Sequence, residues 1–477
     1  MVDTASTTTG KLYAEHVKVY PQRIAGTFRR LKWLGLAVLL GLYYAAPWLR
    51  WHRGEGAPDQ ALLIDMPGRR AYFFFIEIWP QEVYYLMGLL IVGAIGLFLV
   101  TAWAGRVWCG FTCPQTVWTD LFMQVERWIE GDRNKRMRLD QAPLSLGKVA
   151  RKLAKHAVWV AIALATGGAW IFYFNDAPTT LRAIVTGQAG AAVYGFIGLF
   201  SATTYLLAGW AREQVCIYMC PWPRFQSAMF DEDTLLVTYE EWRGEPRSHV
   251  KTKPAGETVG DCIDCGLCVR VCPTGVDIRK GQQLACIGCA LCVDACNDVM
   301  ARIGRPGDLI TYDSLANQAA RAAGRPTRFR PIRPRTLIYA VILVAVVAAM
   351  ATLLLRRDTL DVAVQPDRAP LFVRLSDGSI RNGYTIKILN KERDTQHFRL
   401  ALHGLDGARL SVIGYTPDAA GGILLPVAGD SVGTFTGFVQ APRDALAGES
   451  NHIDFAITDV ETSRTAHHGS IFRGPAR

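Results

Sequence analysis

The sequence predicts a multi-domain membrane protein: an α-helical bundle of five transmembrane spans, an inserted cysteine-rich α+β domain and a C-terminal all-β immunoglobulin-like sandwich. Three observations lead to this fold class. The 477 residues are 50% hydrophobic with a mean hydropathy of +0.14, which soluble proteins of this length rarely reach. The 12 cysteines are confined to residues 109–296, which favours metal binding over a disulfide framework. Residues 360–477 contain no cysteine and show polar–apolar alternation.

Five apolar stretches are each close to the roughly 20 residues that cross a bilayer. A buried helix of a soluble protein is the alternative for any single stretch, but five in one chain favour a membrane. The predicted spans are Trp33–Leu49, Val83–Trp103, His156–Phe174, Ala191–Trp210 and Thr336–Leu355.

The distribution of Lys and Arg predicts the orientation of these spans. Basic residues are frequent in 11–32, in 106–155 and in RPTRFRPIRPR before the fifth span, although the first outer loop also carries arginines. We therefore expect the N-terminus and segment 211–335 in the cytoplasm and the residues after 356 in the bacterial periplasm. The start of the chain has no apolar h-region, so no signal peptide is expected. The net charge of +10 is explained by orientation, and no nucleic-acid-binding motif is present.

Eight cysteines form two C-x2-C-x2-C-x3-C runs, the pattern of bacterial two-cluster ferredoxins. Each cluster takes three cysteines from one run and the fourth from the other. One predicted [4Fe–4S] cluster is bound by Cys262, Cys265, Cys268 and Cys296, and the second by Cys286, Cys289, Cys292 and Cys272. Structural zinc is the alternative, but a doubled run with Pro273 after the first favours clusters. Small residues such as Gly266 and Gly288 let the backbone approach the sulfides. The predicted chemistry is one-electron transfer at low potential.

Two C-x3-C-P motifs, WCGFTCP and CIYMCP, follow the second and fourth spans on the predicted cytoplasmic side. The proline suits the first turn of a helix, whose amino terminus should lower the pKa of the preceding thiol. The thiols expected to converge into a catalytic site are Cys109, Cys113, Cys216 and Cys220. Thiolates select soft ions such as Cu(I), and Met219 adds a soft thioether. A redox-active dithiol, a third iron–sulfur centre and mere packing remain alternatives, whereas a stable disulfide is disfavoured in the cytoplasm.

The last part of the chain reads as a β-sandwich because segments such as YTIKILN, HFRLALHG and HIDFAITDV alternate polar and apolar residues between turn signals. Five segments are expected along the chain. These are a cytoplasmic N-terminal segment (1–32), a four-span membrane domain (33–230), a cytoplasmic two-cluster ferredoxin domain (231–335), a fifth transmembrane helix (336–355) and a periplasmic immunoglobulin-like domain (356–477).

The arrangement as a whole resembles the cytochrome c oxidase accessory proteins of the CcoG family, also called FixG or RdxA. The segments that carry the resemblance are WCGFTCPQTVWTDLFMQVERWIEG and QVCIYMCPWPRFQSAMFD, together with the ferredoxin runs and the β-rich tail. One departure is Asn297 where a second C-P proline is usual. The first half is also similar to membrane ferredoxins of the NapH and NosR type.

The resemblance implies a cupric reductase of the bacterial inner membrane that reduces Cu(II) to Cu(I) on the cytoplasmic side for assembly of a cbb-type oxidase. It implies that Cys109, Cys113, Cys216 and Cys220 bind copper and that the other eight cysteines bind two [4Fe–4S] clusters. The implied partners are the lipid bilayer, a copper chaperone or transporter, and oxidase assembly factors. The electron donor is unidentified, a homodimer is compatible with the sequence, and no nucleic acid is expected. The alternatives are an electron-transfer subunit feeding a quinol or periplasmic reductase, and a non-catalytic assembly scaffold.

Overall fold

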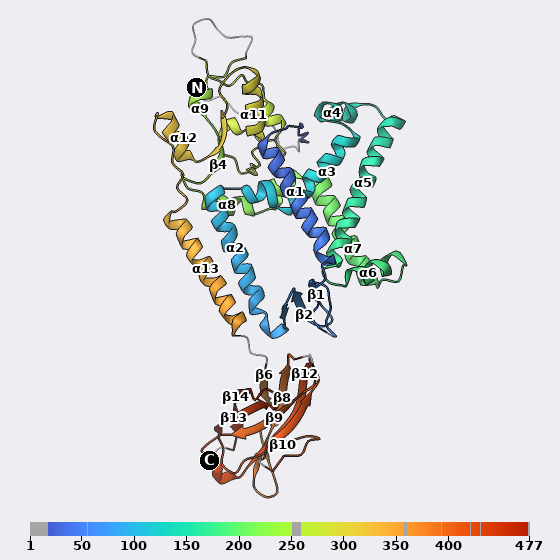
Figure 1. Ribbon diagram of the computed structural model, residues 1–477, viewed down its shortest axis with the longest axis vertical. Helices are drawn as coiled ribbons and strands as arrows, with labels where there is room; N and C mark the ends of the chain where they lie inside the picture. The colour runs from blue at the N-terminus through green and yellow to red at the C-terminus, as the bar shows by residue number, and fades with distance from the viewer. Residues whose placement is uncertain are drawn as a thin grey trace, which may run out of the picture. The chain divides into compact units, whose positions relative to one another are not determined.

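A computed structural model describes residues 18–54, 56–249, 259–356, 360–392, 394–419, 421–429 and 431–475 (Figure 1). The chain divides into two compact units, Met1–Met350 and Ala351–Arg477, and each is described by itself. The expectation that no signal peptide is present falls on residues 1–17, outside the described residues. The five-segment division stays a prediction.

Five helices in the described residues are long and apolar enough to cross a membrane. The helical stretches are Thr27–Trp48, Pro80–Ala104, Leu146–Ile171, Ala191–Ala211 and Pro334–Leu355. They contain α1 (Thr27–Ala45), α2 (Tyr84–Ala104), α5 (Leu146–Ile171), α7 (Ala191–Thr204) and α13 (Pro334–Leu355). Few of their side chains are buried, and 0% of the most apolar window of α13 is buried, which suits contact with lipid.

Two of these helices begin earlier than the apolar pattern predicts. Helix α5 starts at Leu146 rather than His156, because the hydroxyl of Ser145 accepts a hydrogen bond from the backbone N–H of Lys148 at 3.2 Å and caps the helix there. Helix α1 starts at Thr27 rather than Trp33. Hydropathy detects only the apolar part of each helix, whereas capping decides where it begins.

Shorter elements connect the apolar helices of this unit. The strands and single-turn helices on the way to α2 are η1 (Ala46–Trp48), β1 (Leu62–Asp65), β2 (Arg70–Phe73), β3 (Ile76–Ile78) and η2 (Pro80–Glu82). The strands pair antiparallel in the order β1-β2-β3. The helices that follow are α3 (Pro114–Ile129), α4 (Arg133–Gln141), α6 (Ala177–Val185) and α8 (Trp222–Met229), with π-helical turns η3 (Trp108–Thr112), η4 (Tyr205–Ala211) and η5 (Val215–Met219).

The inserted cysteine-rich region mixes short helices and strands, as an α+β domain should. Its elements are β4 (Leu236–Tyr239), α9 (Glu241–Gly244), α10 (Leu267–Arg270), η7 (Ile278–Lys280), α11 (Leu291–Arg302), β5 (Ile310–Asp313) and α12 (Leu315–Ala322). Strands β4 and β5 pair antiparallel. Their apolar side chains pack on α11 and on several of the cysteines, so the thiols lie inside the core of this region.

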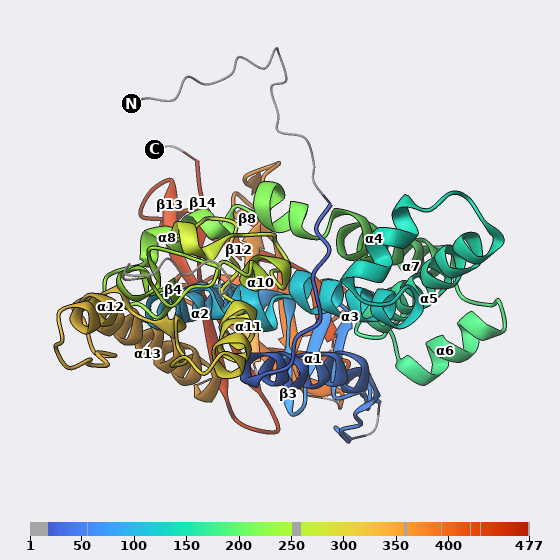
Figure 2. The ribbon, with the colours of Figure 1, turned by 90° about the horizontal axis from the view of Figure 1, so that it is seen from above.

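The inserted region caps the first turn of α1. The Asp294 carboxylate on α11 accepts hydrogen bonds from the backbone N–H groups of Phe28, at 3.2 Å, and Arg29, at 2.8 Å. These N–H groups have no partner inside α1, so the carboxylate supplies one. Figures 1 and 2 both show α11 beside the beginning of α1. A Cβ on Gly26 would collide with the Asp294 side chain, which explains the glycine before this helix.

The inserted region also caps the C-terminal end of α2, where backbone carbonyls lack partners within the helix. The carbonyl of Ala102 accepts from the Thr234 hydroxyl at 3.0 Å, and that of Trp103 accepts from the Leu235 N–H at 3.0 Å. The Tyr312 hydroxyl donates to the carbonyl of Ala104. The inserted region is therefore attached to two helices through backbone groups that would otherwise need water.

The second unit is built from antiparallel strands. In its described residues one sheet has the order β10-β12-β8-β6 with β7 also on β8, and another has the order β11-β9-β13-β14. The strands are β6 (Leu360–Pro366), β7 (Val373–Arg374), β8 (Ile380–Asn390), β9 (Gln396–His403), β10 (Arg409–Val412), β11 (Ile423–Val427), β12 (Ser431–Ala441), β13 (Ser450–Asp459) and β14 (Thr465–Arg473). Alternate side chains of both sheets, among them Tyr384, Ile386, Leu400 and Phe455, share one buried core.

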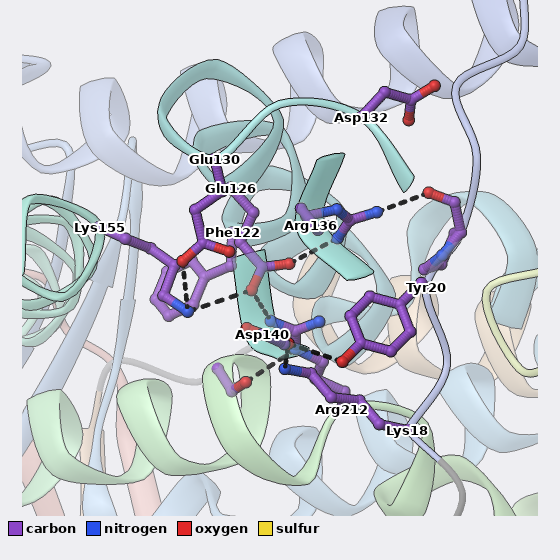
Figure 3. Close-up of polar contacts among 12 residues, drawn as sticks. Lys18, Tyr20, Phe122, Glu126, Glu130, Asp132, Arg136, Asp140, Lys155 and Arg212 are labelled. Carbon is purple, nitrogen blue, oxygen red and sulfur yellow. Dashed lines mark hydrogen bonds and ion pairs between the residues drawn. The ribbon is translucent and has the colours of Figure 1, made fainter. Parts of the chain in front are cut away.

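A buried ion network holds the first unit together near the start of the described chain (Figure 3). The Glu126 carboxylate on α3 pairs with Arg212 at 2.5 Å, Arg136 at 2.8 Å and Lys155 at 3.4 Å. Arg136 also donates to the carbonyl of Pro21 at 2.7 Å. Burial opposes ionisation of Glu126, but the surrounding cations outweigh it and lower its pKa to about 2.

We predict that Glu126→Gln lowers the free energy of unfolding by about 3–5 kcal/mol, because it leaves buried cations without their counter-charge. The pKa of Glu126 in the folded protein, about 2, lies below its ordinary value. The stability that the ionised carboxylate contributes is therefore fully present above the pKa of the unfolded chain, and it is lost as the pH falls through about 2. The deficit should therefore be constant between roughly pH 6 and pH 8. Denaturant unfolding of the detergent-solubilised protein measures it.

Asp59→Asn is the matched control, because it removes an exposed carboxylate that pairs with Arg50 at 2.6 Å. It should cost no more than about 1 kcal/mol. Equal losses in the two variants would contradict the importance of the Glu126 network.

Candidate functional site

The two ferredoxin runs have the same backbone shape. Left-handed residues occupy equivalent positions in each: Asp264 (φ +50°) and Gly266 (φ +64°) in the first, Gly288 (φ +68°) and Ala290 (φ +55°) in the second. Alternating backbone conformations of this kind turn successive N–H groups into a concavity that binds anions, including iron–sulfur clusters. The runs therefore fit an anionic cluster through their backbone as well as through their thiols.

The first set of four thiols lies together. The pKa of Cys296 is raised to about 12, first by burial. The neighbouring thiols that raise this pKa further are Cys268, Cys262 and Cys265. Thiolates act on one another in this way only over short distances, so the last cysteine of the second run lies with the first three of the first run. Cys265 is exposed, while Cys262 and Cys268 are buried.

The second set of four thiols is grouped in the same crossed manner. Burial raises the pKa of Cys292 well above its ordinary value, and the thiols that add to the rise are Cys289, Cys286 and Cys272, followed by Cys268 of the first set. The Cys272 sulfur also accepts a hydrogen bond from the Val276 N–H at 3.3 Å. The influence of Cys268 on Cys292 shows that the two sets are neighbours.

No three His, Cys, Asp or Glu side chains in the described part of the chain surround the position of a single metal ion. In a [4Fe–4S] cluster each of the four thiolates binds a different iron atom. The donor set and the backbone concavities therefore fit two [4Fe–4S] clusters.

The two C-x3-C-P motifs are a structural repeat. Each is preceded by a left-handed residue, Gly105 (φ +56°) before the first and Arg212 (φ +43°) before the second. Each then forms a π-helical turn, η3 and η5, which ends when the second cysteine donates its N–H five residues back: Cys113 to Trp108 and Cys220 to Val215, both at 2.8 Å. The first is followed by Pro114 in the first turn of α3, as predicted.

The four thiols of these motifs, Cys109, Cys113, Cys216 and Cys220, are called the thiol quartet below. The pKa of Cys109 is raised to about 12 by burial and by Cys113, Cys216 and Cys220, against the opposing effect of Arg106. The structure therefore brings the quartet together. Cys220 is exposed and the other three are half-buried, and the neighbouring Met219 is 63% exposed.

The prediction that a helix amino terminus lowers the thiol pKa is wrong for Cys113. Its pKa is raised, because burial outweighs the hydrogen bonds from the backbone N–H groups of Thr116 and Gln115. Burial thus keeps Cys109, Cys113 and Cys216 protonated until a cation replaces their protons. Their spacing also differs from that of a formed single-ion site, since no three of them surround one position.

The quartet packs directly on the second cluster set. Cys109 and Cys216 pack against the apolar cluster that contains Cys289, and Cys292 packs against the same cluster. Gly110 lies against the second run so closely that a Cβ on it would stand 3.0 Å from the Cα and N of Cys289. Only a glycine permits this approach of the two backbones.

The Arg106 side chain connects the segments that meet where the thiol quartet packs on the second cluster set. Its guanidinium donates to the carbonyls of Leu284 and Cys286, at 2.5 and 2.7 Å, and to that of Pro223 at 2.8 Å. The end of α2, the loop that carries Cys286 and the start of α8 are therefore joined by one side chain. Arg106 is 6% exposed.

Sequence reasoning missed Arg106, Arg212 and Asp294. The two arginines have a signal that could have found them, because each lies between an apolar run and the first cysteine of its motif. No signal in the sequence distinguishes Asp294 from an ordinary carboxylate on a helix. Its role depends on α1, which is distant in the sequence.

Three segments match known families. Residues 211–315 match the 4Fe-4S dicluster domain, residues 86–136 match a 4Fe-4S binding domain, and residues 350–475 match the Ig-like fold at the C-terminus of the FixG oxidoreductase. The nitrogen fixation protein FixG of Rhizobium meliloti is 50% identical over 466 residues, covering 92% of this chain and 89% of that protein. The chain belongs to the FixG/Rdx family. Protein RdxB of Cereibacter sphaeroides is 48% identical over 474 residues, 98% of both chains.

A crystal structure of a FixG-related protein from Vibrio parahaemolyticus is 25% identical and has a TM-score of 0.21, covering 24% of this chain and 96% of that one. Membership of the FixG/Rdx family confirms the resemblance found in the sequence. The chain is a membrane protein and an iron–sulfur oxidoreductase that takes part in electron transfer.

We predict about eight iron atoms per chain when both cluster sets are filled with four-iron cubes. Cys292→Ser should retain about four, because it removes one ligand of the second set only. Cys109→Ser should retain all eight. Iron and acid-labile sulfide analysis, with EPR spectra of the reduced protein, measures these contents. A content near twelve that falls to eight in Cys109→Ser would contradict the assignment of the quartet to copper.

Proposed function

We propose that this FixG/Rdx protein is a cupric reductase of the bacterial inner membrane. Electrons from a low-potential donor reach the thiol quartet through two [4Fe–4S] clusters. There Cu(II), the substrate, takes up one electron and becomes Cu(I). The cluster ligands proposed are those of the two cysteine sets described above, and the proposed copper ligands are Cys109, Cys113, Cys216 and Cys220.

The observation that carries the proposal is the contact between the quartet and the second cluster set. Cys109 and Cys216 pack against the apolar cluster that contains Cys289, and Gly110 touches the backbone of Cys289. An electron that reaches the second cluster is therefore next to four thiols. Cys265, the exposed thiol of the first set, supports that set as the point of entry.

The quartet suits a substrate ion better than a resident one. Thiol sulfur is a soft donor that favours Cu(I), and the exposed Met219 adds a thioether beside the exposed Cys220. Because the pKa values of Cys109, Cys113 and Cys216 are raised, an ion must displace the protons of these thiols to bind. A site that forms only with its ion also releases that ion readily, as turnover requires.

The proposed membrane arrangement has five spans, α1, α2, α5, α7 and α13. The quartet and the ferredoxin region lie in the cytoplasm, and an immunoglobulin-like β-sandwich lies in the periplasm. The basic segments before α1, after α2 and before α13 support this orientation. The reduced copper is proposed to serve assembly of a cbb-type cytochrome c oxidase, through a copper chaperone or transporter and the oxidase assembly factors.

A third iron–sulfur centre is the second candidate for the quartet. The match of residues 86–136, which contain Cys109 and Cys113, to a 4Fe-4S binding domain favours it. In that case the protein would be an electron-transfer subunit that delivers electrons to another reductase. The iron content predicted above separates the two candidates.

The purified holoprotein is first reduced with dithionite until no free dithionite remains. We predict that this reduced protein converts added Cu(II) to Cu(I), which is measured as its bicinchoninate complex. Cys109→Ser combined with Cys113→Ser should lower the rate at least about 100-fold while leaving the iron content intact. Thr112→Ala is the matched control, because its hydroxyl donates within the same turn, to the Trp108 carbonyl at 3.1 Å, without offering a sulfur. Its rate should stay within about twofold of the parent.

Equal rates in the parent and the double serine variant would contradict the proposal. So would an inactive parent whose clusters are fully reduced. Copper binding measured with Cu(I) should fall in the double variant alone.

A further inference from the structure

A buried arginine, Arg106, lies beside the second cluster set and is 6% exposed. In the described part of the chain its hydrogen bonds go to main-chain carbonyls, those of Gln283, Leu284, Cys286 and Pro223, and none goes to a carboxylate. The positive charge is therefore held by neutral groups. Arginine keeps its charge when it is buried, so this cation lies inside the protein beside the second set.

Two contacts place Arg106 against the second set. Its guanidinium donates to the Cys286 carbonyl at 2.7 Å. Its backbone faces Gly288, where a Cβ would stand 3.1 Å from the Cβ of Arg106. Burial lowers the pKa of Arg106, and Cys286 and Cys109 oppose that shift. The same cation thus acts on the second set and on the quartet.

Two cations near the first set have carboxylate partners. Arg279 pairs with Asp277 at 2.8 Å and with Asp264 at 2.5 Å. Arg243 pairs with Asp261 at 3.0 Å. Their charges are largely cancelled, because each lies beside an opposite charge.

Two other arginines near the first set donate to main-chain carbonyls, as Arg106 does. Arg270 donates to the Cys265 carbonyl at 2.9 Å, and Arg305 donates to the carbonyls of Gly260 and Asp261 at 3.1 and 2.7 Å. Both residues are partly exposed, so water screens their charges.

A second buried cation, Lys32, lies near the second set, but it also has carboxylates around it. Lys32 is 3% exposed and lines a small cavity with Cys216, Ile287 and Glu213. It lowers the pKa of the Asp120 carboxyl, so its charge also acts on that carboxylate. Arg106 is 6% exposed and its hydrogen bonds go to neutral groups, whereas Arg270 and Arg305, which also bind neutral groups, are partly exposed.

We propose that Arg106 raises the reduction potential of the second cluster above that of the first, and so directs electrons from the first set to the second and on to the quartet. Adding an electron increases the negative charge of a cluster. Burial of the second set disfavours this, whereas a nearby cation favours it strongly where water is excluded. Arg106 is a positioning residue in this account. It acts through the clusters and has no contact with the substrate.

The steps balance as one-electron transfers. A low-potential one-electron donor reduces the first cluster at the exposed Cys265 face. The first cluster is oxidised as the second is reduced. The second is then oxidised as one Cu(II) becomes Cu(I). Only this last step rests on the proposed function, and the order of the two potentials does not.

The test is an EPR-monitored redox titration of the copper-free holoprotein in detergent, with dithionite as the reductant. Cys292→Ser, which retains only the first cluster, assigns the two waves. We expect the second-set wave of the parent at the more positive potential. Arg106→Gln removes the charge and should move this wave to a potential more negative than the first-set wave, reversing the order. Arg106→Lys keeps the charge and should leave the order unchanged, and neither variant should move the first-set wave.

A second pair of variants leaves Arg106 in place, in case Arg106→Gln loses iron. Leu284 is 56% exposed and lines a cavity of about 180 Å³ with Arg106 and Cys286. Leu284→Glu places a carboxylate beside the guanidinium and should shift the second-set wave to more negative potential. Leu284→Gln, of the same size and neutral, should not shift it.

The proposal is overturned if Arg106→Gln and Arg106→Lys move the wave equally, if both waves move together, or if Leu284→Glu behaves like Leu284→Gln. A purely structural Arg106 would give these results. Because no copper is present, the outcome is separate from the proposed function. If the two potentials are as predicted but the protein does not reduce Cu(II), only the proposed cupric reductase function is contradicted.

Discussion

The arrangement of the redox groups depends on one buried guanidinium. Arg106 follows the end of α2, and its side chain binds two other main-chain segments, the loop with Cys286 and the start of α8. Without it the carbonyls of that loop would be buried with no donor, and the ferredoxin region would lose its attachment beside the first C-x3-C-P motif. The caps on α1 and α2 also attach the inserted region, because Asp294 and Thr234 of that region hydrogen-bond to backbone groups at the ends of these helices. The ferredoxin region is thus held by hydrogen bonds to backbone groups as well as by apolar contacts such as that of Phe28 with its core.

The cysteines explain why this docking matters. Burial raises the pKa of Cys109 and of Cys216 to about 12, so neither thiol is a ready nucleophile. Such thiols become useful when a metal replaces their protons. The ferredoxin sets have left-handed residues and N–H groups that favour a resident cluster, whereas the quartet has an exposed edge at Met219 and Cys220. The difference suits a pair of fixed electron carriers beside a site that exchanges its ion.

Patterns of residue type and spacing predicted much of this. The ferredoxin runs, the apolar helices and the β-rich tail are local features, which spacing and hydropathy detect directly. What escaped prediction depends on groups far apart in the sequence. Arg106 donates to the Cys286 carbonyl, and Asp294 caps the start of α1. The thiol pKa was predicted in the wrong direction, because the helix amino terminus is visible in the sequence and the burial of Cys113 is not.

The central claim is that electrons pass from the clusters to copper at the thiol quartet, and a single-turnover EPR experiment tests it most directly. The protein is reduced by one electron under anaerobic conditions and mixed with one equivalent of Cu(II), and both spin signals are followed by freeze-quenching. We predict that the cluster and Cu(II) signals disappear together in a one-to-one ratio in the parent protein. Both should persist when Cys109 and Cys113 are replaced by serine. Cluster oxidation that proceeds equally fast in the serine variant would contradict the account.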